Sequence, residues 1–193
     1  MSILVVGISH RSAPMSVLEQ VALDEDGAAK LVSDVMDVEH VSEATVLSTC
    51  NRTEVYAEVD RFHGSVEAIS RMIGERAGAD TEGLLPHLYV HYDDGAVSHL
   101  LNVASGLDSM VVGESQILGQ VREALRSGQE TSSIGPALNL LFQQALRVGK
   151  RTHAETGIDQ AAPSVVSAAL AEIDRDLAGT DAVVVGAGSM ASL

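Results

Sequence analysis

The first 92 residues alternate between short apolar runs and longer segments with helical spacing, which restricts the possible folds severely. Ile3 to Ile8 is an apolar run and is predicted to be a buried strand. Further strands are predicted at Ala44 to Ser48, Glu54 to Val59 and Leu88 to Tyr92, and helices at 15–23, 25–37 and 65–77. The order β-α-β-β-α-β predicts an α+β, ferredoxin-like domain, in which an antiparallel sheet carries helices on one face.

The boundary between the first two predicted helices is set by Asp24, whose side chain is suited to cap the N-terminus of the second. From Gly95 onward the pattern is helical, with helices predicted at 95–104, 115–130 and 136–155. Turns are predicted at Gly113, Ser132-Ser133 and Gly135-Pro136. A further helix is predicted at 164–178, where Pro163 lies near the N-terminal end and Gly179-Thr180 follows the C-terminal end.

The last residues change character again. Asp181 to Val185 is predicted to be a strand of the parallel type, and Gly186 to Ala191 follows it directly with the pattern G-x-G-x-x-A. Such a turn lets the backbone approach a pyrophosphate at the N-terminus of a helix. The chain stops at Leu193, before a second strand. We therefore expect a truncated longer protein in which a nucleotide-binding domain is only begun.

Composition narrows the classes of function. The formal net charge of −15 is the opposite of the basic surface that a non-specific nucleic-acid binder presents, so a nucleic-acid partner would need a local basic patch or additional sequence. No apolar stretch approaches the roughly 20 residues of a membrane helix, and the N-terminus lacks a basic segment before its apolar run. We expect a cytoplasmic protein without a membrane segment, in which the one cysteine stays reduced.

That cysteine, Cys50, lies between two predicted strands. Thr49 and Asn51 offer hydrogen-bonding groups to a polar substrate, and Arg52 is expected to favour the thiolate. A thiolate that attacks an activated ester forms a thioester and divides acyl transfer into two steps. Free cysteines are also common as inert core residues. From these residues alone, a nucleophile and a buried structural thiol both remain open.

Other candidates have equally plain structural explanations. His99 is predicted to lie in a helix beside Val97 and Leu100, where a packed, hydrogen-bonded histidine is the default, and His10 falls in a turn. The segment from Gly106 to Gln116 is either a substrate-lining loop or a turn with a helix cap at Ser115. The basic stretch that contains Arg147, Lys150, Arg151 and His153 is either a solvated helix face or a phosphate contact. No group of residues has zinc or iron spacing, so no metal site is predicted.

Five blocks of the sequence, in order, resemble glutamyl-tRNA reductase. They are Gly7 to Pro14, Leu47 to Glu54, Ala104 to Glu114, Ile117 to Arg122 and Gly186 to Met190. The resemblance implies NADPH-dependent reduction of glutamyl-tRNA to glutamate-1-semialdehyde, the first step of the C5 route to tetrapyrroles, including haem and porphyrins. It also implies a V-shaped homodimer whose subunits have catalytic, NADPH-binding and dimerisation domains along a long helix.

The resemblance also assigns roles to single positions. Cys50 matches the nucleophile that forms the glutamyl thioester, and His99 matches a histidine needed for activity. Arg52 would bind a substrate carboxylate, and Glu114 would suit the substrate's α-ammonium group. The substrate-binding positions are Thr49, Asn51, Arg52, Ser109, Glu114, Ser115, Gln116 and Gln120. The NADPH-binding positions are Gly186, Ala187, Gly188, Ser189, Met190 and Ala191.

These assignments divide the chain into a catalytic domain at 1–158, the start of a linker helix at 159–179 and the start of an NADPH domain at 180–193. Because the NADPH site is incomplete, we expect this chain to form the thioester without reducing it, and dimerisation to need residues beyond it. Two alternatives are a cysteine-dependent aminoacyl-ester hydrolase and a regulatory module. The regulatory module would bind a partner protein, or haem with His10, another histidine or Cys50 as its axial ligand.

Overall fold

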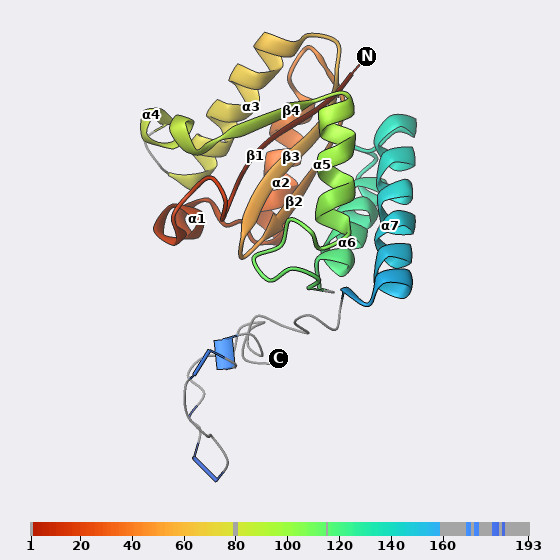
Figure 1. Ribbon diagram of the computed structural model, residues 1–193. Coiled ribbons are helices and arrows are strands. Elements are labelled where there is room, and N and C mark those ends of the chain that lie inside the picture. Colours follow the sequence, from red (N-terminus) through yellow and green to blue (C-terminus); the bar gives the residue numbers. More distant parts are fainter. Residues whose placement is uncertain are drawn as a thin grey trace.

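The computed structural model describes residues 2–78, 81–114 and 116–158, with 169–170, 172–173, 179–181 and 183 (Figure 1). The helix predicted at 164–178 lies mostly outside these residues, and the turn predicted at Gly186 to Ala191 lies entirely outside them. None of the described helices combines the length and the hydropathy needed to cross a membrane.

An antiparallel sheet forms the centre of the described fold. Its order is β2-β3-β1-β4, so β2 and β4 are the edge strands. Residues Val46 and Val6 both lie opposite Val55, one on each side of β3. The α+β class and the antiparallel sheet predicted from the sequence are confirmed. The strands are β1 (Ser2–Ser9), β2 (Val41–Thr49), β3 (Arg52–Val59) and β4 (Tyr89–Tyr92).

One face of the sheet is covered by α1 (Met15–Val21), α2 (Glu25–Met36) and α3 (Phe62–Ala77). Alternate residues such as Leu4, Val6 and Ile8 point to this face and form one apolar cluster with the helices. Asp24 caps α2 as predicted, because its carboxylate accepts the backbone N–H of Gly27 at 2.8 Å. The short α4 (Thr81–Leu84) and the 3-10 helix η1 (Leu85–His87) follow α3 and lead into β4.

The opposite face is covered by α5 (Asp94–Ala104), α6 (Gln116–Glu130) and α7 (Pro136–Thr156), which lie together on one side of the sheet in Figure 1. Val5, Leu47 and Tyr56 point to this face and form a second apolar cluster. The rings of Tyr56 and Phe142 meet edge to face, with centroids 5.2 Å apart. The sequence predicted helices on one face of the sheet, and this holds for α1 to α3 but not for α5 to α7. Both faces are covered because the strands are apolar on both.

Edge strand β2 holds this second layer in place through polar contacts. The buried carboxylate of Glu43 accepts the backbone N–H groups of Ala137 at 3.0 Å and Leu138 at 2.7 Å, and so caps α7. A cap of this kind contributes on the order of 1 kcal/mol. Thr45 donates its hydroxyl to the carbonyl of Ala124 at 3.0 Å, which fixes α6 against the same strand. These contacts set the position of α6 beside the turn that follows β2.

Candidate active site

Cys50 and Asn51 form the two-residue turn that joins β2 to β3, and Thr49 lies opposite Arg52 at its base. The hydroxyl of Thr49 accepts the backbone N–H groups of Asn51 and Arg52, both at 3.1 Å. The backbone N–H of His10 donates to the carbonyl of Asn51 at 3.0 Å. The turn is therefore held from two sides while Cys50 is exposed. An inert core thiol is excluded by this exposure.

A small hollow lies beside the turn. Its volume is ≈ 10 Å³, which is about enough for one water molecule. Its lining brings together seven of the predicted site residues with Met110 and Ile117. Those seven are Thr49, Cys50, Asn51, Arg52, Ser109, Glu114 and Gln120. The structure does not place His99 or Gln116 in this lining, and Ser115 lies outside the described residues.

The other wall of the hollow is the loop between α5 and α6. Gly106 and Gly113 have φ values of 74° and 88°, in the left-handed region that favours glycine. The N–H of Gly113 donates to the carbonyl of Gly106 at 3.0 Å and closes the loop on itself. A Cβ at Gly113 would also lie 2.3 Å from the carbonyl oxygen of Ile158. The glycines thus allow the loop to place Ser109 and Glu114 over the turn.

The thiol of Cys50 is not activated in this arrangement. Although Cys50 is exposed, the walls of the hollow partly desolvate its thiol and so raise the pKa of Cys50 above its ordinary value, and the negative charge of Glu114 raises it further. Burial also raises the pKa of Glu114, which is 8% exposed. The prediction that Arg52 favours the thiolate is therefore wrong. The positive charge of Arg52 is paired with the carboxylates of Glu54 and Asp108.

Arg52 is 2% exposed, and its guanidinium joins two acidic side chains. Nη1 donates to Glu54 Oε1 at 2.7 Å, and both terminal nitrogens lie 3.1 Å from Asp108 Oδ2. Nη2 also donates to the backbone carbonyl of Asp108. Burial by itself would lower the pKa of Arg52, but the adjacent Glu54 carboxylate raises it above its ordinary value. The other oxygen of Asp108 lies 2.7 Å from Nε of Arg11, which is exposed.

Glu54 is the centre of this cluster and is fully buried. It accepts hydrogen bonds from Arg52, from Tyr56 at 2.6 Å, from Tyr89, and from His99 Nε2 at 2.8 Å. Burial would raise the pKa of Glu54, but the hydrogen bond from His99 and the charge of Arg52 hold it at about 2. Burial and then Glu54 raise the pKa values of Tyr56 and Tyr89. The carboxylate is therefore ionised and saturated with donors.

His99 is packed and hydrogen-bonded, as its helical context predicted. Its Nε2 must carry a proton, because the carboxylate of Glu54 can only accept. Its ring stacks on that of His91, with centroids 4.3 Å apart and planes at 20°. His99 therefore reaches the thiol turn indirectly, through Glu54 and Arg52. Nearer the turn, His10 has a buried Nδ1 that lacks a hydrogen-bond partner among the described residues.

Sequence reasoning missed Glu54, Asp108 and Tyr89 as members of the site. One available signal was the spacing of Arg52, Glu54 and Tyr56, because alternate residues of a strand lie on one face. The sequence could therefore have predicted a buried pair of opposite charges in β3. The contact with Asp108 joins residues 56 positions apart and has no local signature. Of the basic stretch in α7, Arg151 is exposed and pairs with Glu155 at 3.0 Å, which fits the solvated-face alternative.

These features define a class: an α+β domain that presents an exposed cysteine on a fixed turn, beside a polar hollow and a buried charge cluster. Residues 6–156 match the model of the family described as glutamyl-tRNAGlu reductase, N-terminal domain, and the chain belongs to that family. The resemblance to this family is thereby confirmed, and four of the five sequence blocks lie within the matched residues, whereas Gly186 to Met190 lies beyond them.

Similar proteins agree with this assignment. The chain is 67% identical to glutamyl-tRNA reductase 1 of a Nocardioides species, over all of this chain and 46% of that protein. It is 53% identical to glutamyl-tRNA reductase of Streptomyces coelicolor, over all of this chain and 34% of that protein. The structure of glutamyl-tRNA reductase from Methanopyrus kandleri matches 88% of this chain and 38% of its own, with 32% identity and a TM-score of 0.68. The chain thus spans less than half the length of these relatives.

Proposed function

We propose that Cys50 takes the glutamyl group of glutamyl-tRNA as a thioester, in the NADPH-dependent reduction to glutamate-1-semialdehyde that begins tetrapyrrole synthesis. The observation that carries this proposal is the exposed thiol on a turn held by Thr49 and His10, next to a hollow lined by polar side chains. In this step the sulfur bonds to the ester carbonyl carbon and the bond to the ribose oxygen of tRNA breaks. The thiol proton ends on the released ribose hydroxyl.

Arg52 is the partner that we propose for the substrate's side-chain carboxylate. A carboxylate already occupies its outer side, because Asp108 accepts from both terminal nitrogens while Glu54 holds the inner side. The hollow is also too small for a glutamyl group. Binding therefore requires the loop from Gly106 to Gly113 to move and the substrate carboxylate to replace Asp108. Arg11, which already contacts Asp108, would keep that displaced carboxylate paired.

Glu114 is the partner that we propose for the substrate's α-ammonium group. Its charge opposes ionisation of Cys50 in the free protein. An ammonium group bound against Glu114 would neutralise that charge and so remove one of the two causes that raise the thiol's pKa. The substrate itself would then help to activate its nucleophile. Thr49, Asn51, Ser109 and Gln120 line the same hollow and would bind the remaining polar atoms.

His99 is proposed as a positioning residue and not as a group that touches the thiol. Its contact with Glu54 helps to keep that carboxylate ionised, and the carboxylate in turn fixes Arg52. Gln116 and Ser115 stay predictions as substrate contacts. So do the NADPH contacts of Gly186 to Ala191, which lie outside the described residues, and no part of thioester formation needs them.

Wider assignments of fold, domains, assembly, location and regulation are also proposals. The strand order and the crossover helices support a ferredoxin-like unit in β1 to β4, and the family match over residues 6–156 supports a catalytic domain at 1–158. Homodimerisation and a cytoplasmic location rest on the resemblance and stay predictions. No observation favours haem binding over catalysis, and regulation by haem also stays a prediction.

The direct test is the intact mass of the protein after it is mixed with glutamyl-tRNA and quenched in acid. We expect a gain of one glutamyl group that hydroxylamine removes, and no gain in Cys50→Ala. Arg71→Ala, a change on the exposed surface of α3, is the matched control and should keep the adduct. An unmodified wild-type mass, or the same adduct in Cys50→Ala, would contradict the proposal. Release of free glutamate in many turnovers would favour the hydrolase alternative.

A further inference from the structure

Edge strand β2 has backbone N–H and carbonyl groups that form no hydrogen bond with another described strand. The backbone N–H of Ala44 donates to the carbonyl of Ser133 at 2.8 Å, which shows that Ala44 points away from β3. Alternate residues of a strand share this direction, so the backbone groups of Val46 and Ser48 also point outward. Among the described residues, no hydrogen bond reaches the outward backbone groups of Val46. The middle of the edge is therefore open, between Ser133 and the Cys50 turn.

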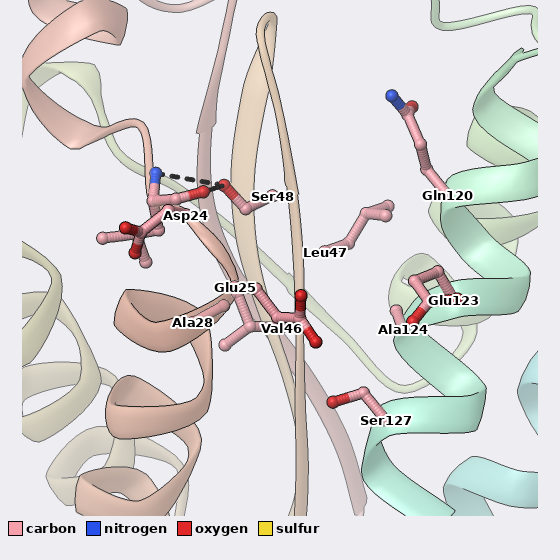
Figure 2. Close-up of a pocket in the computed structure, with 11 residues that line it drawn as sticks. Asp24, Glu25, Ala28, Val46, Leu47, Ser48, Gln120, Glu123, Ala124 and Ser127 are labelled. Carbon is pink, nitrogen blue, oxygen red and sulfur yellow. Dashed lines mark hydrogen bonds between the residues drawn. The ribbon is translucent and has the colours of Figure 1, made fainter. Parts of the chain in front are cut away.

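The open edge lies at the bottom of a groove between two helices. Figure 2 shows Val46 and Ser48 on the strand, with α2 on one side and α6 on the other. Two hollows of ≈ 320 and ≈ 360 Å³ follow the strand and share Ala28, Val46 and Ser127. The helices pack on opposite faces of the sheet, so the space between them continues the plane of the sheet. An added strand would fit there with its side chains toward α2 and α6 in turn.

The charges on the groove indicate what kind of strand it would accept. Asp24 and Glu25 line the end near Ser48, and neither forms an ion pair with any described residue. The N-terminal end of α2 offsets part of this charge but not both carboxylates. Glu123 on the opposite side is paired with Arg126 and contributes little. A second copy of this chain is disfavoured as the occupant, because its net charge is also −15.

We propose that the free edge of β2 binds an extended peptide segment that carries basic side chains, by strand addition between α2 and α6. The backbone groups of Val46 and Ser48 pair with the peptide, and Asp24 and Glu25 receive its cationic side chain. Gln120 lines both this groove and the Cys50 hollow, so the bound segment lies next to the thiol site. This interaction goes beyond the proposed acyl transfer, and its test needs no enzymatic activity.

The probes are two six-residue peptides that alternate valine with lysine or valine with glutamate. Titration of the ¹⁵N-labelled protein is followed by amide NMR. We expect the lysine peptide to shift the Val46 and Ser48 amide signals in a saturable manner. The glutamate peptide should bind at least about tenfold more weakly. Absence of saturable shifts at β2, or equal binding of both peptides, would overturn the proposal. So would shifts confined to another surface.

Four variants separate the contribution of the backbone to peptide binding from the contribution of charge. Val46→Pro removes an outward N–H without removing a hydrogen bond to β3. It should lower the affinity for the lysine peptide about tenfold. Because proline can disturb a strand, Ser127→Arg provides a second block by filling the place that both hollows share. Glu25→Lys should reverse the preference between the peptides, whereas Glu75→Lys on α3 carries the same charge change and should not. Unaltered binding in both Val46→Pro and Ser127→Arg would contradict strand addition.

Discussion

The two faces of the sheet are built on different principles. The face under α1 to α3 is an apolar cluster centred on Leu4, Val6 and Ile8. The face under α5 to α7 has a comparable apolar cluster around Tyr56 and Phe142, but it also contains the fully buried Glu54 with its donors. The turn that presents Cys50 is attached to this second face through Arg52. The comparison shows that α1 to α3 contribute no residue to the lining of the Cys50 hollow, whereas the second face connects stability to the geometry of the site.

The difference has an energetic basis. Burial of apolar groups is non-directional, so the first face can adjust when a side chain is shortened. A buried charge must keep its partners, and the loss of one leaves the other uncompensated. The second face is therefore expected to be less tolerant of substitution and more sensitive to pH.

The largest effect is expected from Glu54→Gln, which leaves Arg52 buried with one carboxylate in place of two. The free energy of unfolding should fall by about 3–5 kcal/mol, measured by urea denaturation. Glu58→Gln on the same strand is the control, because Glu58 is only partly buried and bonds to Ser42; it should change stability by about 0.5 kcal/mol or less. Similar losses in the two variants would remove the distinction between the buried cluster and the rest of β3.

A cavity on the apolar face should cost slightly less and should leave the site intact. Leu31 is fully buried in α2, and Leu31→Ala should lower the free energy of unfolding by about 3 kcal/mol. The folded variant should still form the Cys50 adduct at the wild-type rate, because no polar contact of the site is lost. A large fall in the rate of adduct formation, measured on protein shown to be folded, would mean that the two faces are coupled.

Lowering the pH should reduce the stability contributed by the buried charge cluster of the second face. The pKa of Glu54 is lowered from 4.5 to about 2, so its ionised form contributes stability above pH 4.5. That contribution, on the order of 3 kcal/mol, is lost as the pH falls from about 4.5 toward 2. Leu31→Ala should show the same slope of stability against pH as the wild type. Glu54→Gln should show a smaller slope in this window, and an unchanged slope would assign the acid sensitivity to other groups.

The smallest effect concerns the thiol itself. Glu114→Gln removes one of the two causes that raise the pKa of Cys50, so the midpoint of its alkylation by iodoacetamide should move to lower pH. At pH 8 the alkylation rate should rise by about two- to fivefold. Glu123→Gln, on the exposed face of α6, should leave the rate unchanged. No shift in Glu114→Gln would show that the charge of Glu114 does not act on the thiol.

Much of the fold was predictable because local pattern determines it. The apolar run at Ile3 to Ile8 and the capping residue Asp24 each specify an element without long-range information, and those elements are present. The second helical layer was predicted as separate helices, but its place over the opposite face was not. That placement depends on Glu43, Thr45 and other contacts between residues far apart in the chain.

The candidate site divides in the same manner. The hairpin with Cys50 and its polar neighbours is local, and the predicted residues of the turn do line one hollow. The closed state of that hollow was not predictable, because it depends on the pairing of Asp108 with Arg52 across the fold. The same pairing explains why Arg52 does not activate the thiol as the sequence suggested.

The central claim is that Cys50 receives an acyl group whose carboxylate replaces Asp108 on Arg52. The most direct measurement compares the rates at which the Cys50 adduct forms from glutamyl-tRNA and from glutaminyl-tRNA. The glutaminyl group is nearly the same size but lacks the charge that Arg52 requires. We predict that the glutamyl adduct forms at least about a hundredfold faster. Equal rates of adduct formation from the two substrates would contradict the account.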